Sequence, residues 1–515
     1  MTPSPSHATS NLSLDRLRTE GETFMQELSR EYYLAHSGQK ASAELQPIYE
    51  RHRGILGTDA LAMVLEAFRG APDGSEEQRA TRLLVDWLAE AQSSRELAPL
   101  EEREIDWEGK AVVRVGDSGG REIEFQRVAI ELANVTDMHE RHAIDAARAK
   151  VVQDGLAPLR LERFQREKEI TERLELASGY NETFELLSGV SLSGLRAECD
   201  AFLRDTQAMW DEVLPEFLRR RLGMTVAEVT RGDALALFRA REFDQYFPAG
   251  AMEASVRKQV RDMGVDPVAA GRIIFDTGDR EGKRSRAFCA PVRVPDEVYL
   301  VMRPHGGQTD WNTFLHELGH ALHFAYMRPD LPFEYRWFGD NSITEAYAML
   351  FDHLMQDSGW LQRYTELTAS SVREFLRAAG FEELHFLRRY AAKLSYEIDL
   401  YGGAVSWKAL PSLYVDKLTA ATSFRYHTAD AFVDVDPRFY AARYLRAWQL
   451  QALLGETLVE RFDEDWWRNP RTGSWVCSAL FGEGQRELAD EQAERVSGKR
   501  LSFAPLVRAI ERMLG

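Results

Sequence analysis

Cysteine is scarce in this sequence, and long apolar runs are absent. Among 515 residues the chain has 3 cysteines, an odd and sparse set that argues against a disulfide framework and for a reducing compartment. No stretch approaches the roughly 18 consecutive apolar residues of a membrane span. The first residues, Met1 to His7, are polar and lack the apolar core of a secretory signal. We therefore expect a cytoplasmic protein with no membrane partner.

Basic residues are fewer than acidic residues in this sequence. The chain has 64 lysines and arginines against 82 aspartates and glutamates, which gives a net charge of −18. This balance disfavours nucleic acid and anionic membrane surfaces as partners, and it leaves the oligomeric state unknown. The length exceeds the usual size of a single hydrophobic core, so we expect two lobes.

Helical periodicity dominates the chain, because charged faces alternate with leucine, alanine and aromatic positions. The segments that show it are Leu14–Leu34, Leu61–Phe68, Glu77–Gln92, Asp137–Leu174, Ser191–Arg221 and most of Phe351–Leu400. Two places break the pattern: Ala111–Val115 with Glu122–Phe125, which predicts a hairpin, and the strand-rich segment Arg286–Met302. We predict a mainly α-helical fold with a disordered tail over residues 1–13, a helical lobe with an inserted β-hairpin over 14–205, and a second region over 206–515.

The most informative stretch is His316-Glu317-Leu318-Gly319-His320, an HExxH pattern inside a run with helical periodicity. Residues four apart lie on one face of a helix, so His316 and His320 can direct their imidazole nitrogens at one metal ion. Glu317 can reach water at that metal without taking a ligand position, which is where a general base is needed. The pattern is typical of zinc hydrolases. The alternative is a buried core helix whose two histidines bond to nearby carbonyls.

A catalytic zinc usually takes three protein ligands and leaves one position for water, so a third ligand is required. Glu345 is our choice, because the intervening chain is long enough to cross a loop and return on a second helix. Two alternatives stay open on the residues alone. Ser342 and Glu345 also fit a capping box, in which the glutamate bonds the backbone at a helix start. His323 competes as a ligand, since it lies three residues past His320 on the same face.

These motifs together resemble the thimet oligopeptidase and oligoendopeptidase F family. The resemblance is strongest over Lys283–Asp352, and its motifs are Arg286-Ala287-Phe288-Cys289, Val298–Met302, the run from His316 to His323, and Glu345-Ala346. It implies one Zn(2+) per chain, held by His316, His320 and Glu345, with Asp352 behind the ligating histidines. It also implies that residues 206–515 form a zinc-peptidase region, that two helical lobes enclose a deep channel beside a small β-sheet, and that the substrates are short unfolded peptides.

A second constellation lies near the C-terminus, where Tyr440, Arg443 and Tyr444 share one face of a helix that begins near Pro437. Tyrosines on such a face more often pack than catalyse. The resemblance, together with a similar arginine–tyrosine pair in the angiotensin-converting enzyme group, implies that Tyr444 bonds the developing oxyanion and that Tyr440 contacts substrate. Family members have a histidine where this chain has Val433–Asp436, and an acidic residue there could select basic groups in the substrate.

The reaction expected from these residues is peptide hydrolysis, in which Glu317 takes a proton from water and returns it to the leaving amine. The segment Val298–Met302 predicts a strand whose edge pairs with an extended substrate, so we expect Tyr299 and Leu300 to contact the peptide.

Three function classes remain open, and a zinc endopeptidase leads them. A carboxypeptidase or peptidyl-dipeptidase needs a cation for the free carboxylate, and Lys283, Arg443 and Arg446 are available. A peptide-binding descendant without activity is the third class. The complete ligand set argues against it, because binding has no need of the base Glu317.

Overall fold

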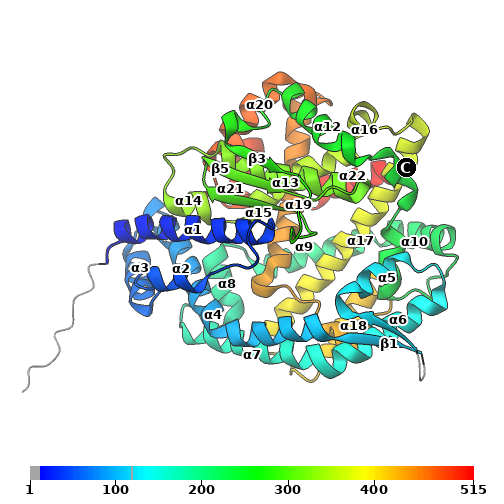
Figure 1. Ribbon diagram of the computed structural model, residues 1–515, viewed down its shortest axis with the longest axis horizontal. Coiled ribbons are helices and arrows are strands. Elements are labelled where there is room, and N and C mark those ends of the chain that lie inside the picture. The colour runs from blue at the N-terminus through cyan, green and yellow to red at the C-terminus, as the bar shows by residue number, and fades with distance from the viewer. Residues whose placement is uncertain (1–11, 117–119) are drawn as a thin grey trace, which may run out of the picture.

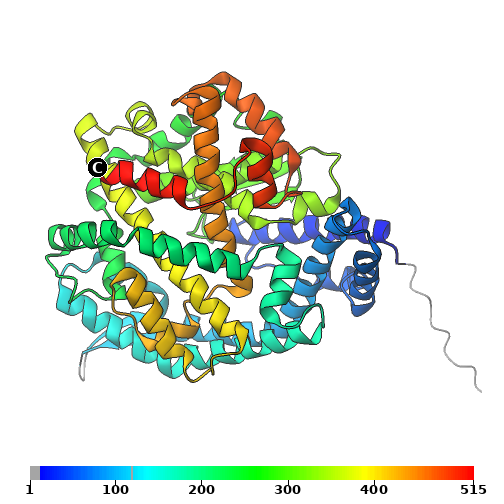
Figure 2. The same ribbon diagram turned by 180° about the vertical axis from the view of Figure 1, so that it is seen from behind.

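The computed structural model describes residues 12–116 and 120–515, so most of the predicted tail over residues 1–13 lies outside it. The mainly helical fold class is confirmed (Figures 1 and 2). No helix in the described part of the chain is long and apolar enough to cross a membrane. The helices are α1 (Leu14–His36), α2 (Gln46–Arg51), α3 (Thr58–Gly70), α4 (Glu76–Lys110), α5 (Val128–Asn134), α6 (Met138–Val151), α7 (Ala157–Arg173), α8 (Tyr180–Ser188), α9 (Leu192–Asp205), α10 (Gln207–Leu222), α11 (Ala234–Phe238), α12 (Ala249–Asp262), α13 (Gln308–Tyr326), α14 (Phe333–Trp337), α15 (Asn341–Asp352), α16 (Ser358–Tyr364), α17 (Ala369–Gly402), α18 (Leu410–Thr422), α19 (Tyr440–Phe462), α20 (Pro470–Trp475), α21 (Ala489–Ser497) and α22 (Ala504–Leu514).

The helices are arranged around one long central element. Helices α4 and α7 run side by side along one edge of the molecule, at the bottom of Figure 1, and α12 and α20 lie at the opposite edge. The 34-residue helix α17 runs between these edges and packs on α18 and α22. The largest cluster of buried apolar side chains includes residues from Ala149 to Ile510. This cluster continues across residue 205, and the division into two regions there stays a prediction.

A hairpin interrupts the N-terminal helices, as the sequence predicts. Strands β1 (Val112–Val115) and β2 (Arg121–Glu124) pair in antiparallel register, with Val113 opposite Ile123. Both of these side chains are buried, and they pack in a small cluster with Ile144 of α6. The hairpin is therefore attached to the helical core by alternate apolar residues, the pattern from which it is predicted.

A second, three-stranded sheet lies beside α13. Its strands are β3 (Ile273–Asp276), β4 (Phe288–Arg293) and β5 (Glu297–Val301), in the order β3-β5-β4. Strand β3 is parallel to β5, and β4 is antiparallel to it. One face of the sheet, with Val298 and Leu300, joins the cluster that contains α13, and the other face, with Val292 and Val301, packs on α1. The small sheet beside the metal-motif helix is thus confirmed.

Helix α13 carries the HExxH motif and packs closely on α15. Phe314, Leu315 and Leu318 of α13 are fully buried, which agrees with the expected apolar face. A Cβ atom on Gly319 would lie 2.6 Å from Cα of Ala348 and from the carbonyl oxygen of Tyr347. Only glycine permits this close approach of the two helices.

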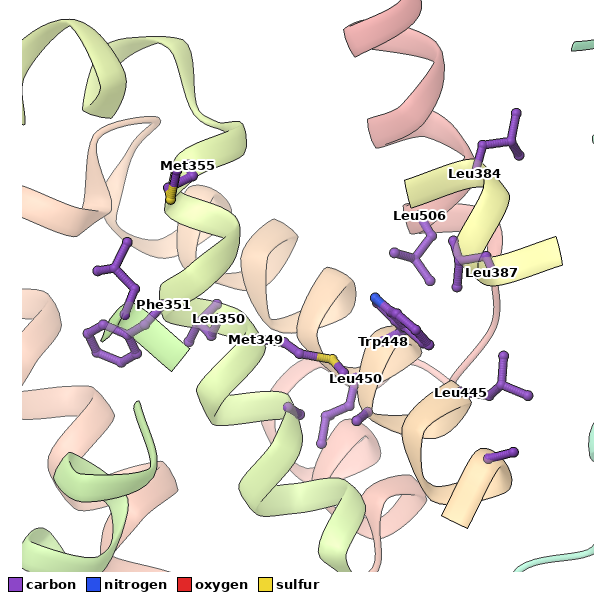
Figure 3. Close-up of a cluster of buried hydrophobic side chains, with 14 of the residues drawn as sticks. Met349, Leu350, Phe351, Met355, Leu384, Leu387, Leu445, Trp448, Leu450 and Leu506 are labelled. Atoms are coloured by element: carbon purple, nitrogen blue, oxygen red, sulfur yellow. The ribbon is translucent and has the colours of Figure 1, made fainter. Parts of the chain in front are cut away.

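Helix α15 is buried on all sides, and its neighbours fix its position. Every residue from Ser342 to Asp352 is buried. Figure 3 shows how Met349 and Leu350 of α15 lie near Trp448 and Leu450 of α19, with side chains of α17 and α22 beyond them. Because interiors of this kind are close-packed, the polar side chains of α15 are held in fixed positions relative to α13 and α19.

Candidate metal centre

His316 and His320 lie one turn apart on α13, and their rings make an edge-to-face contact with centroids 4.9 Å apart. Glu345 approaches them from α15. Its Oε2 atom lies 3.4 Å from Nε2 of His316 and 3.8 Å from Nε2 of His320. One ligand atom from each residue lies within 4.8 Å of the other two. The structure therefore brings together the three residues predicted as metal ligands.

The donor set fits a zinc ion. Two atoms bound at about 2.1 Å to a tetrahedral ion are about 3.4 Å apart, and the distances from Glu345 to the two histidines are close to this value. Oε2 of Glu345 is buried without a hydrogen-bond partner in the described residues. A buried carboxylate oxygen of this kind is costly unless a cation is nearby. Two imidazoles and one carboxylate form a ligand set that occurs in catalytic zinc sites.

The second nitrogen of each histidine is held by α15. Nδ1 of His316 lies 2.8 Å from Oδ2 of Asp352, and Nδ1 of His320 lies 2.9 Å from Oγ1 of Thr344. A carboxylate can only accept, so Nδ1 of His316 is the donor and its Nε2 is the atom directed at Glu345. Asp352 occupies the position that the resemblance implies. Thr344 was not among the residues predicted from the sequence, although it directly precedes Glu345.

A further pair of charged residues extends the support behind His316. Nδ1 of His353 lies 2.5 Å from Oδ1 of Asp352, and its Nε2 lies 3.1 Å from Oε1 of Glu383 on α17. Although burial lowers the pKa of His353, Glu383 and Asp352 raise it well above its usual value. The ring therefore donates from both nitrogens as a cation. Neither His353 nor Glu383 was predicted from the sequence, where the adjacent Asp352-His353 pair is the local signal.

The pKa values of the two histidines in this group are shifted in opposite directions. Burial lowers the pKa of His320 to about 4, so this ring is neutral at pH 7. Burial lowers the pKa of His316 as well, but the nearby carboxylates of Asp352 and Glu345 outweigh burial and raise it to about 10. Both histidines lower the pKa of Glu345 to about 2, against the effect of its burial. The surroundings of His316 therefore favour its protonated form, and those of His320 favour its neutral form.

Glu317 lines a cavity of about 390 Å³, together with His320 and Thr344. Cys289 of β4 lines the same cavity and donates a backbone hydrogen bond to Glu317. Burial raises the pKa of Glu317, while the neighbouring His316 and the bond from Cys289 oppose this shift. A carboxylate with a raised pKa is better matched to proton transfer near neutral pH. The predicted general base is thus beside the ligands without being one of them.

Two tyrosines project from the first turns of α19 near the metal ligands. The hydroxyl of Tyr440 donates a 2.6 Å hydrogen bond to Oε1 of Glu345, the oxygen that does not face the histidines. This contact was missed from the sequence, and the predicted substrate contact of Tyr440 stays a prediction. The ring of Tyr444 lies 5.0 Å from that of Tyr440 and edge-on to Trp448. Burial and the charge of Glu345 raise the pKa of Tyr444, so its hydroxyl is a donor at neutral pH.

The prediction that the edge of Val298–Met302 pairs with a substrate is wrong. Strand β5 lies between β3 and β4, so it has no free edge. Leu300 is fully buried in the main core, and Tyr299 faces the opposite side, where it stacks on Tyr33 with centroids 3.8 Å apart. Neither residue is among those that line the cavity. The free edge beside the cavity belongs to β4, and the error arose because the four-residue strand β3 was missed.

The two alternatives to Glu345 as third ligand are resolved. His323 is fully buried, its Nε2 donates to the carbonyl of Gly484 at 3.3 Å, and burial lowers its pKa to about 3. It is a packed histidine outside the metal-ligand group. The capping-box interpretation is wrong, because the side chain of Asp340 caps α15 by accepting from the N–H of Ser342 at 2.9 Å. Glu345 is turned toward the histidines instead.

Comparisons with known proteins place the fold. No protein-family model and no curated protein matches the sequence. A solved structure of the Pyrococcus furiosus carboxypeptidase, described as the Apo-Mg form, matches with a TM-score of 0.61 and 13% identity over 97% of each chain. A candidate peptidase from Chlamydophila abortus matches with a TM-score of 0.68 and 13% identity, over 97% of this chain and 89% of that one. The chain shares their fold. The likeness to the oligoendopeptidase F family remains a resemblance of motifs.

Proposed function

We propose that this protein is a zinc-dependent peptidase that hydrolyses peptide bonds within short unfolded peptides. The observation that carries the proposal is the convergence of His316, His320 and the unpartnered Oε2 of Glu345, with Glu317 beside them on the cavity wall. A fold shared with a carboxypeptidase and a candidate peptidase supports it. A merely structural site would not need a free carboxylate next to its ligands.

The residues divide the chemical work among them. Zinc bound at this site would act as a Lewis acid on the substrate carbonyl and lower the pKa of water. Glu317 accepts a proton from the attacking water and donates it to the leaving amine. Tyr444 donates a hydrogen bond to the carbonyl oxygen as negative charge develops there, an interaction of about 3 kcal/mol in comparable sites. Tyr440 and Asp352 keep Glu345 and His316 in place.

An extended peptide fits the free edge of β4. An unpaired strand offers backbone donors and acceptors to a ligand that adds as a further strand. Strand β4 contains Pro291, a residue that sheets accept mainly on edge strands because it has no N–H. The cavity of about 390 Å³ lies at the lower end of the range for ligand pockets, so it suits a short stretch of extended chain.

The decisive experiment is metal analysis and a peptidase assay of wild type and Glu317→Gln. We expect one zinc per chain in both proteins, and hydrolysis in the variant reduced by roughly 10²- to 10⁴-fold, because only the proton acceptor is lost. Glu464→Gln, at an exposed position far along the chain, is the matched control and should behave as wild type. Unchanged hydrolysis in Glu317→Gln would exclude Glu317 as the base.

The position of cleavage is tested separately. We expect a quenched peptide that is blocked at both ends to be cut internally by the zinc-loaded protein. Cleavage that requires a free C-terminus would favour the carboxypeptidase alternative. If no peptide is cut while one zinc per chain is bound, the peptidase proposal fails.

A further inference from the structure

Two arginines line the cavity that contains Glu317. Arg284 and Arg286 lie in the loop that leads into β4, and both belong to the cavity wall. The loop is fixed to the fold, because the backbone N–H of Arg284 donates to the carbonyl of His36 at the end of α1, at 2.8 Å. The backbone of the loop is therefore held at Arg284, and both arginines contribute to the cavity wall.

These two side chains are exposed and have no ion pair or hydrogen bond with any residue that the structure describes. Their neighbour Lys283 is different. It is buried, and its Nζ bonds to Oδ1 of Asp276 at 3.0 Å and to the carbonyl of Gly278 at 2.8 Å. The loop thus uses one cation to hold its own shape and leaves two cations unpaired at the cavity.

Arg286 lines the same cavity as the residue proposed as general base. Glu317 and His320 belong to the wall of this cavity together with the two arginines. A ligand atom bound by this arginine would therefore lie near the peptide bond to be cleaved.

The other cations considered from the sequence are already paired. Arg443 lies 3.8 Å from Oδ2 of Asp86, and Arg446 is buried in an ion pair with Asp490. Lys283, as described above, is engaged by Asp276. None of the three is free to hold a substrate carboxylate.

The acidic residues suggested as a selector of basic groups are paired too. Asp434 is buried, accepts a 2.7 Å hydrogen bond from Tyr414 and pairs with Arg389. Asp436 lies 2.8 Å from Nζ of Lys393. Their charges are neutralised within the protein, so selection of basic substrates by these residues has no support in the structure.

We propose that Arg284 and Arg286 bind a carboxylate group of the peptide substrate and give the enzyme a preference for peptides that present one near the cleaved bond. This inference rests on the proposed peptidase function. A guanidinium matches a carboxylate through two parallel N–H···O bonds. The chain as a whole carries a charge of −18 and repels acidic peptides, so only local cations can supply such a preference.

The carboxylate can come from an acidic side chain or from a free C-terminus, and four quenched peptides separate these sources. They share one sequence but carry glutamate or glutamine beside the cleaved bond, each with a free or an amidated C-terminus. In wild type we expect kcat/KM to be roughly 10- to 100-fold higher with the recognised carboxylate, as for other hydrogen bonds to charged groups. The peptide pair that shows the difference identifies the source.

The variant Arg284→Gln/Arg286→Gln tests the assignment to these residues. We expect the ratio of kcat/KM between carboxylate and neutral peptides to fall to about one, and the wild-type ratio to shrink at high salt. The matched control Arg373→Gln/Arg500→Gln removes the same charge from two exposed positions elsewhere and should keep the wild-type ratio. A ratio that survives in the first variant, or that is about one in wild type, would overturn the inference.

A binding measurement keeps this test separate from the proposed function. The labelled peptides are titrated into Glu317→Gln by fluorescence anisotropy, with and without the two arginine substitutions. Tighter binding of the carboxylate peptide that disappears with the arginines supports the inference even if no turnover is seen. Equal binding of all four peptides contradicts it, whatever the peptidase assay gives.

Discussion

The two ends of α15 support the two proposed metal ligands of α13 by different means. At its first turn, the neutral hydroxyl of Thr344 lies against Nδ1 of His320. At its last turn, the carboxylate of Asp352 lies against Nδ1 of His316 and is itself bonded to His353. A hydroxyl leaves the buried imidazole neutral, whereas a carboxylate stabilises its protonated form. The contacts from α15 therefore favour a neutral ring at His320 and a protonated ring at His316.

We expect from this difference that protonation of His316 competes with metal binding, and that protonation of His320 does not do so near neutral pH. Nε2 of His316 faces Glu345, and Asp352 and Glu345 raise the pKa of this ring to about 10 against the effect of burial. A metal ion needs that same atom unprotonated. The end of α15 that contains Asp352 therefore sets the pH dependence of metal binding, and the end that contains Thr344 sets only ring orientation.

The largest effect on zinc binding is expected for Glu345, which faces both His316 and His320. Glu345→Gln removes the anionic ligand between the histidines, so we expect zinc content after dialysis to fall well below one per chain and hydrolysis to be lost with it. Metal analysis of the dialysed protein checks this. Glu317→Gln should keep its zinc under the same conditions, and full zinc in Glu345→Gln would show that the histidines find another third ligand.

The next largest effect is expected for the two tyrosines of α19, one proposed to contact the substrate and the other bonded to Glu345. Tyr444→Phe removes the proposed oxyanion donor, so we expect kcat to fall by about 10²- to 10³-fold at unchanged zinc content. Tyr440→Phe is the matched variant, because its hydroxyl bonds Glu345. We expect weaker zinc binding in Tyr440→Phe, measured by competition with a chelator. The reverse pattern would exchange the roles of the two tyrosines.

The comparison itself is tested by the pH dependence of zinc binding. His316 has a pKa of about 10, so it is protonated between pH 6 and 8 and zinc must displace one proton. The zinc association constant of wild type should therefore rise about tenfold per pH unit over this range. In Asp352→Asn the main stabiliser of the cation is gone, and we expect a clearly shallower slope in chelator competition titrations. Equal slopes in the two proteins would refute the coupling through Asp352.

The smallest effect is expected at the other end of α15. Thr344→Val removes one neutral hydrogen bond to His320, which is worth about 1 kcal/mol and corresponds to roughly a fivefold loss of zinc affinity. Burial already keeps His320 neutral above pH 4, so the loss should be the same at every pH from 6 to 8. A loss that grows toward low pH would mean that Thr344 also controls protonation, and the two ends of α15 would then act alike.

The sequence predicted the local parts of this structure better than the long-range ones. The HExxH spacing predicts that His316 and His320 share a face, because helical geometry alone requires it. The position of Glu345 follows only from the resemblance, since Ser342 makes a capping box equally plausible and only the structure shows that Asp340 caps the helix. The prediction that Leu300 contacts the substrate failed because strand β3, which pairs with the second edge of β5, was not recognised in the sequence.

Residues that meet only in the folded chain leave little trace in the sequence. Tyr440 reaches Glu345 across 95 positions, and Glu383 reaches His353 across 30. Periodicity places each of these residues on a helix but does not say which neighbouring helix that face will meet. Sheet order is set in the same way, because a short strand such as β3 determines whether β5 is central or at an edge.

Gly319 ties the packing of two helices to the chemistry between them. It lies between the ligating histidines in the sequence, and its missing side chain allows α13 to rest directly on the backbone of Ala348. A methyl group at this point would push the helices apart, and the carboxylate of Glu345 would move away from both imidazoles with them. The geometry of the proposed metal site and the packing of the core therefore depend on the same contact, and neither can be altered there without altering the other.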